Sequence, residues 1–221
     1  MEKTNNVRLA LREHLKLLHL PTTSCILAFA IIGSTSAPVI YLDRLLLLII
    51  QLFFVGGIAS NYFDEIKGRP WHTKIQGTHL WIIGFSALFI SNIIGIFLTI
   101  TIAWWFGVFV TLWNFFTLTY NLELFNGFFH NTPSLSLSWG TVFLGSYYLQ
   151  NPIISSQILI LSIITGYIAG YGRNLYETAK PYCKDKDSSQ RKAKNSWILL
   201  KILILFVDLL AMTRLAYVLL V

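Results

Sequence analysis

Over most of its length the sequence has very little charge and almost no cysteine. No Asp, Glu, Lys or Arg occurs in residues 17–42, 45–63, 75–122, 124–172 or 202–207. Gaps of this length exclude an ordinary soluble domain, whose helices carry charge on the face turned to water. The two cysteines, Cys25 and Cys183, are far apart in the chain, which excludes a disulfide framework or a cysteine-based metal site. The sequence also contains no P-loop, nucleophile elbow or zinc motif.

The uncharged stretches predict helices that cross a membrane. A bilayer core of about 30 Å is spanned by roughly 20 apolar residues, and 55% of the 221 residues are hydrophobic. The apolar runs are continuous rather than alternating, which favours helices over strands. We therefore predict an all-α, polytopic membrane helix bundle that forms a single domain over residues 1–221. Its seven expected helices cover residues 17–34, 45–63, 77–96, 100–119, 135–150, 153–172 and 197–219.

The positions of the basic residues predict how the bundle is oriented. Of the 17 Lys and Arg residues, four lie in segment 1–16, three in the loop after the second expected helix and seven in the charged loop 173–196. These three segments share one side of the membrane if seven helices alternate in direction. Because basic loops stay in the cytoplasm, the N-terminus is expected to be cytoplasmic and the C-terminus outside. We expect an integral protein of a prokaryotic plasma membrane, with membrane lipids and no nucleic acid as partners.

Polar residues gather where the second and sixth expected helices end. The stretch "ASNYFDEIKGRPWHTK" (residues 59–74) places Asn61 and Asp64 three positions apart, on one side of a helix that Pro70 is expected to end. The stretch "GYGRNLYETAKP" places Asn174 one residue after Arg173, and Glu177 four residues after it. An ion pair between Arg173 and Glu177 explains that spacing as well as a substrate contact does. Both stretches close even-numbered helices, so they are expected to face the same compartment.

These stretches and their order resemble the UbiA-type intramembrane prenyltransferases. That family carries an Asp-rich motif, N-D-x-x-D-x-x-x-D, at the end of its second helix and another acidic motif at the end of its sixth. In "SNYFDEIKGRP", the positions of the three Asp residues are taken by Asn61, Asp64 and Gly68. The segments "LREHLKLLHLPTTSCILAFAIIG" and "YNLELFNGFFHNTPSLSLSWGTVFLG" also resemble parts of the family, and the similarity extends over about residues 8–195.

The resemblance implies an activity, a cofactor and a set of site residues. The activity would be transfer of a prenyl chain from a polyprenyl diphosphate to a ring or lipid acceptor. Asp64 and Glu177 would hold Mg²⁺, assisted by Asn61 and Asn174, because Mg²⁺ takes oxygen ligands from carboxylates and phosphates. Basic side chains pair strongly with phosphate oxygens. Those expected to hold the diphosphate are Lys67, Arg69, Lys74, Arg173 and Lys180.

Departures from the family pattern support an alternative. In the first motif Asp64 is the acid that remains, and in the second Glu177 is followed only by Asp185 and Asp187. The family usually has nine helices, whereas this chain has room for seven. The chain could therefore be a non-catalytic UbiA-like subunit of a larger membrane complex, for example a respiratory one, that binds a lipid or a quinone. Asp208, in the middle of the last expected helix, needs a partner from another helix or from another subunit.

Overall fold

The regular structure of the chain is helical throughout the described part. The computed structural model describes residues 11–184 and 191–220, with side chains for residues 11–180 and 192–220, so Asp185 and Asp187 of the second motif lie outside it. A short helix, Leu11–Leu17, comes first. The elements that follow are α2 (Leu20–Thr35), α3 (Leu42–Leu52), the π-helix η1 (Phe53–Ala59), α4 (Ser60–Lys67), α5 (Gly77–Thr101), α6 (Phe106–Asn121), α7 (Thr132–Gln150), α8 (Ser156–Lys184) and α9 (Arg191–Leu220).

Each of the seven predicted ranges contains a helical segment, and α3, η1 and α4 join into the second of them. By length and composition, four segments could cross a membrane: 42–67, 77–101, 156–180 and 192–220. A fifth is added if Leu11–Leu17 and α2, which meet at a bend of 46°, are one span. The prediction of an all-α bundle is confirmed, and several of its helices are long and apolar enough to cross a membrane. Helix α6 has only 16 residues, and α7 is less apolar because it contains more Ser, Thr and Tyr. Neither is therefore among the helices that are long and apolar enough to cross a membrane.

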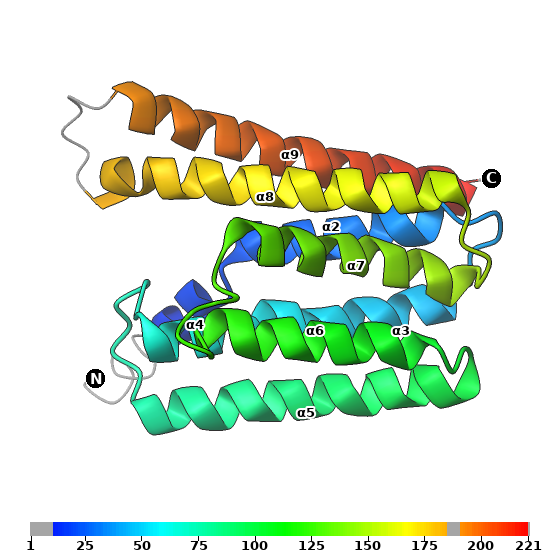
Figure 1. Cartoon of the computed structure of the whole chain (residues 1–221), viewed down its shortest axis with the longest axis horizontal. Coiled ribbons are helices and arrows are strands. Elements are labelled where there is room, and N and C mark those ends of the chain that lie inside the picture. The colour runs from blue at the N-terminus through cyan, green and yellow to red at the C-terminus, as the bar shows by residue number, and fades with distance from the viewer. Residues whose placement is uncertain (1–10, 185–190, 221) are drawn as a thin grey trace, which may run out of the picture.

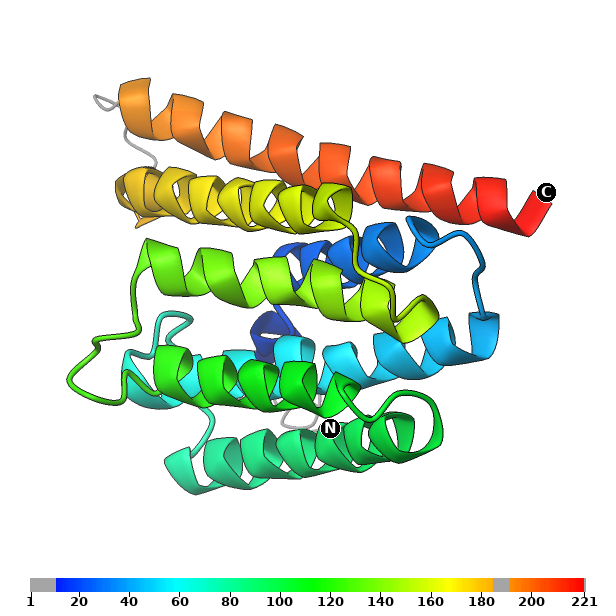
Figure 2. The same ribbon diagram turned by 45° about the vertical axis from the view of Figure 1, so that its right-hand side comes forward.

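The helices lie side by side with their axes roughly parallel (Figure 1, Figure 2). At one edge of the bundle α9 packs against α8 and α2, and α7 packs on the other side of α2 and α8. At the opposite edge α5 packs against α3, η1 and α4, with α6 bridging to α7. The cytoplasmic ends predicted for α4 and α8 are at the same end of the bundle, next to the loops 68–76 and 122–131 (Figure 1).

The interior is filled by large apolar side chains, and the outside is apolar as well. Phe63, Phe106 and Trp113 belong to the central cluster and are almost fully buried. On the outer surface, Phe89 of α5 and Phe206 of α9 are more than half exposed. Helices that are apolar on every side are typical of a membrane bundle, where lipid covers the outer faces. The surface of this bundle is therefore suited to contact with lipid.

The π-helix η1 interrupts the α-helical hydrogen-bonding pattern of the second long segment. It places seven residues, FFVGGIA, in i→i+5 geometry between α3 and α4. Two glycines let α2 approach this turn closely. A Cβ on Gly56 would lie 2.9 Å from the side chain of Ile26, and a Cβ on Gly57 would lie 2.8 Å from that of Thr23. The contact with α2 therefore depends on small residues at these two positions.

Glycine also permits the close packing of α7 against α8. A Cβ added to Gly166 would overlap the backbone carbonyl of Ser136, and a Cβ on Gly140 would lie 2.9 Å from the backbone oxygen of Ser162. Backbone atoms of packed helices cannot rotate away as side chains can. The two helices are therefore in contact at small residues, an arrangement common between membrane helices.

We predict that Gly166→Ala lowers the free energy of unfolding by about 1–3 kcal/mol, the usual cost of forcing an extra carbon into a packed interior. The measurement is chemical unfolding in detergent micelles. Gly77→Ala is the matched control, because a Cβ at Gly77 meets nothing within 4 Å. Equal stability of the two variants would contradict the packing described for α7 and α8.

Candidate functional site

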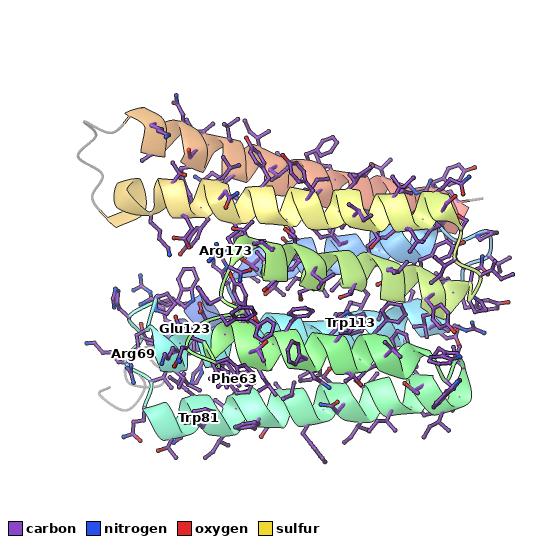
Figure 3. The ribbon with its side chains drawn as sticks, in the orientation of Figure 1. Phe63, Arg69, Trp81, Trp113, Glu123 and Arg173 are labelled. Atoms are coloured by element: carbon purple, nitrogen blue, oxygen red, sulfur yellow. The ribbon has the colours of Figure 1, made fainter. Side chains whose placement is uncertain are left out.

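The ends of α4 and α8 converge on the end of α6. Tyr120 interacts electrostatically with Asp64 of α4 and with Glu177 of α8. Asp64 in turn interacts with the charges of His130 and Lys180. Two motifs that are far apart in the sequence thus share one neighbourhood. Figure 3 shows Arg173, Glu123 and Arg69 toward this end of the bundle, on α8 and on two loops.

Asp64 is a carboxylate with free capacity in this neighbourhood. It is half-buried, and within the side chains described it accepts no hydrogen bond. Attraction from His130 and Lys180 is opposed by repulsion from Glu65 and Glu123. An ionised carboxylate has about four sites for hydrogen bonds or metal coordination. Asp64 is therefore able to bind a cation or a hydrogen-bond donor from outside the chain.

Asn61 turns away from Asp64, into the bundle. Its side-chain amide donates to the carbonyl oxygen of Gly57 at 2.7 Å and to that of Leu18 at 3.4 Å. Three-residue spacing predicts that Asn61 and Asp64 share one side of the helix. Asn61 is instead buried, because acceptors from η1 and from the segment before α2 lie on the inner side. Its amide ties these elements together.

Arg173 holds three segments to α8. Its guanidinium donates to the Tyr120 hydroxyl at 2.6 Å, to the Thr132 hydroxyl at 2.9 Å and to the His130 carbonyl oxygen at 3.4 Å. The hydroxyl of Thr132 also donates to the side-chain oxygen of Asn174 at 2.9 Å. Arg173 and Asn174 thereby join α6, the loop 122–131 and the start of α7.

Glu177 pairs with Lys180 rather than with Arg173. The two charged groups are 2.7 Å apart, and both side chains are substantially exposed. The ammonium group of Lys180 also lies 5.3 Å from the centre of the Tyr176 ring. The ion pair at four-residue spacing that was one interpretation of Arg173 and Glu177 is thus replaced by a pair at three-residue spacing. Lys180 is thus paired with Glu177, while its charge also acts on Asp64.

The remaining basic residues lie on or next to the loop 68–76. Lys67, Arg69 and Lys74 are exposed. The guanidinium of Arg69 donates to the Thr73 carbonyl oxygen at 3.2 Å and to that of Ile75 at 3.5 Å, which closes the loop on itself. The ammonium groups of Lys67 and Lys74 are accessible to an anion at the surface.

Glu65 is the residue of this region that sequence reasoning missed. It is fully buried, and its carboxylate accepts from the backbone N–H of Trp71 at 3.0 Å, the N–H of Thr73 at 2.7 Å and the Thr73 hydroxyl at 2.8 Å. The loop it holds contains Arg69 and His72 in left-handed backbone conformations, with φ of 44° and 49°. One sequence feature points to this role of Glu65. The loop that follows Lys67 has backbone N–H groups that need an acceptor, and Glu65 is a nearby acid.

The carboxylate oxygens at this site could hold a Mg²⁺ ion only if a substrate supplies most of its ligands. Within the described residues there is no group of three or more His, Cys, Asp and Glu side chains that could hold a metal ion. Asp64 is free to coordinate, while Glu177 is already paired with Lys180. Mg²⁺ is commonly held by one or two carboxylates together with phosphate oxygens and water. This site would bind the ion jointly with a phosphate-bearing ligand.

Comparisons with models of protein families, with curated proteins and with solved structures find no match for this chain.

Proposed function

We propose that the protein is a UbiA-like membrane protein that binds a polyprenyl diphosphate at the end of the bundle where α4 and α8 both end, and transfers its prenyl chain to a ring or lipid acceptor. One observation carries the proposal. The two motif segments, which resemble the two acidic motifs of that family, come together so that Tyr120 is within electrostatic range of both Asp64 and Glu177. A site that neutralises a diphosphate needs residues from both segments at one place.

The proposed orientation places this site on the cytoplasmic side. All seven helical segments would cross the plasma membrane of a prokaryote, with the N-terminus cytoplasmic and the C-terminus outside. The distribution of Lys and Arg supports this topology. The position of the α4 and α8 ends at a single end of the bundle also supports it (Figure 1). A lipid diphosphate would then present its head group at the cytoplasmic surface while its chain stays in the bilayer.

The basic residues would bind the diphosphate directly. Lys67 and Lys74 are the cations free to do so, since Arg69, Arg173 and Lys180 are already engaged with protein oxygens. A Mg²⁺ ion held between Asp64 and the diphosphate would stabilise the negative charge that develops on the leaving group. Arg173 and Asn174 would act as positioning residues that keep Tyr120 and the loop 122–131 at the site.

The test is turnover of radiolabelled geranylgeranyl diphosphate by the full chain in nanodiscs, with MgCl₂ and a mixture of quinone-ring and lipid acceptors. We predict that Asp64→Asn, which keeps the side-chain shape, lowers turnover by at least about tenfold, as loss of a charged ligand usually does. Asp43→Asn is the control, because Asp43 begins α3 at the opposite end of the bundle. Full turnover by Asp64→Asn would rule out this role for Asp64.

A second candidate function is binding without catalysis. It is favoured by the internal hydrogen bonds of Asn61 and Arg173, which leave these side chains little capacity for a substrate. The chain would then be a UbiA-like subunit of a larger membrane complex that holds a lipid diphosphate or a quinone-like lipid, with α9 facing other subunits. In the same assay the wild type would retain the labelled diphosphate on a filter and release no product with any acceptor.

A further inference from the structure

A second polar feature lies away from the site at the ends of α4 and α8, between α2, η1 and α9. An open hollow of about 430 Å³ lies between these elements. Its walls are mainly apolar and include Leu20, Leu27, Phe53 and Ile204. Two of its polar residues are Ser24 of α2 and Asp208 of α9. The hollow opens at the surface of the bundle, where the neighbouring side chains of α9 are apolar and exposed.

The carboxylate of Asp208 is only half satisfied inside this hollow. One oxygen, Oδ2, accepts a hydrogen bond from the Ser24 hydroxyl at 2.9 Å. The other, Oδ1, is buried and has no hydrogen-bond partner among the described residues. A buried acceptor without a donor is unfavourable, and an acidic residue within an apolar span is costly. Ser24 satisfies the expectation that Asp208 has a partner on another helix, but it uses one oxygen only.

The cations of α9 nearest to Asp208 in sequence do not complete this arrangement. Lys201 lies over the ring of Trp197, with its ammonium 5.0 Å from the ring centre. Arg214 donates to the backbone oxygen of Thr35. Both cations therefore have partners of their own, and the carboxylate of Asp208, which lines the hollow, keeps hydrogen-bonding capacity that no described residue uses.

We propose that this hollow binds an apolar, lipid-like molecule through one hydrogen-bond-donating head group that donates to Asp208. The shape and the chemistry agree on this class of ligand. The apolar walls formed by α2, η1 and α9 suit an aliphatic or isoprenoid body, and the incompletely satisfied carboxylate of Asp208 selects a hydroxyl or an ammonium over an ether, ester or ketone. The Ser24 hydroxyl, whose single hydrogen can also be donated to the backbone oxygen of Pro21, is the donor from the chain that the ligand would join at Asp208. This site is independent of the diphosphate site proposed above, with which its lining shares no residue.

Photolabelling of the full chain in nanodiscs tests the proposal with three diazirine-bearing probes of equal chain length: a primary alcohol, a primary amine and the methyl ether of the alcohol. Labelled peptides are mapped by mass spectrometry. In the wild type we expect the alcohol, the amine or both to label the peptides of α2, η1 and α9 about tenfold more than the ether does, as a hydrogen bond to a charged acceptor allows. The preference should disappear in Asp208→Leu.

The chain supplies its own internal control. A hollow of about 410 Å³ between α5 and α6, lined by Thr99, Trp104, Trp105 and Val108, has no carboxylate in its lining. There the ether and the alcohol should label equally. Asp208→Asn retains an acceptor oxygen without the charge, so it should keep the preference for the alcohol and reduce that for the amine. Should Asp208→Leu fail to fold, the Asn variant still separates the probes.

Two results would overturn the proposal. One is equal labelling of the α2–η1–α9 hollow by the ether and both donor probes in the wild type. The other is crosslinking of α9 to a second protein chain with exclusion of all three probes, which would assign Asp208 to a subunit interface.

Discussion

Glu65→Ala is expected to lower the free energy of unfolding by about 3–5 kcal/mol, because it removes a fully buried charged acceptor from three donors at once. These donors are the backbone N–H groups of Trp71 and Thr73 and the hydroxyl of Thr73. The loop they belong to holds Arg69 and His72 in left-handed conformations. Such conformations cost roughly 1–3 kcal/mol each in residues other than glycine and persist only where the surroundings impose them. Without Glu65 the loop has lost the group that imposes them.

The measurement is unfolding in detergent, combined with limited proteolysis to detect opening of residues 68–76. Glu65→Gln, which keeps one acceptor oxygen, should fall between the wild type and the Ala variant. Glu177→Ala is the control for loss of a carboxylate, because the ion pair of Glu177 with Lys180 is exposed and exposed pairs contribute little. If Glu65→Ala were no less stable than Glu177→Ala, the loop would not depend on Glu65.

The second large effect is expected from Arg173→Ala, at about 2–4 kcal/mol. Its guanidinium makes hydrogen bonds to Tyr120, His130 and Thr132, which belong to three consecutive segments. Loss of the side chain removes the guanidinium donor from all three of these acceptors and frees the loop 122–131 from α8. Arg173→Lys should recover less than half of the loss, because an ammonium group cannot reproduce the planar fork of a guanidinium.

A double-mutant cycle with Tyr120→Phe separates this network from a general effect of removing charge. The Nε–hydroxyl distance of 2.6 Å predicts a coupling energy of about 1–2 kcal/mol between Arg173 and Tyr120. Lys67→Ala serves as the control, since Lys67 is exposed at the same end of the bundle. Additive effects of Arg173→Ala and Tyr120→Phe would show that the two side chains do not stabilise each other.

The positions of the helices could be predicted from the sequence because the charge-free stretches leave few alternatives. The ends were less predictable. Pro70 was expected to end the second segment near Arg69, whereas α4 ends at Lys67 with Gly68 as its C-cap. The π-helix was not predicted, because FFVGGIA continues an apolar run and has no pattern of its own. Apolar composition indicates that a segment is buried or in lipid without specifying its hydrogen-bonding register.

The site was predictable in position and less so in the directions of its side chains. Both stretches follow even-numbered expected helices, and this correctly predicted that Asp64 and Glu177 lie at the same end of the bundle. The directions of Asn61 and Arg173 depend on partners distant in sequence, such as Leu18 and Tyr120, and no local spacing contains that information. Glu65 was overlooked for the same reason, since its donors are within a loop whose shape the sequence does not reveal.

The π-helix also sets the rotational position of α4. One residue of α-helix turns through about 100°, so removing one residue from η1 would rotate all of α4 by that angle relative to α3. Glu65 would then occupy the direction that Asp64 has now, and Ile66 would replace Glu65 under the loop. An acid would still face Tyr120, while the loop would lose its anchor. A single-residue deletion in η1 thus acts as a rotary adjustment that keeps an acidic side chain facing the site and removes the acidic side chain that supports the loop.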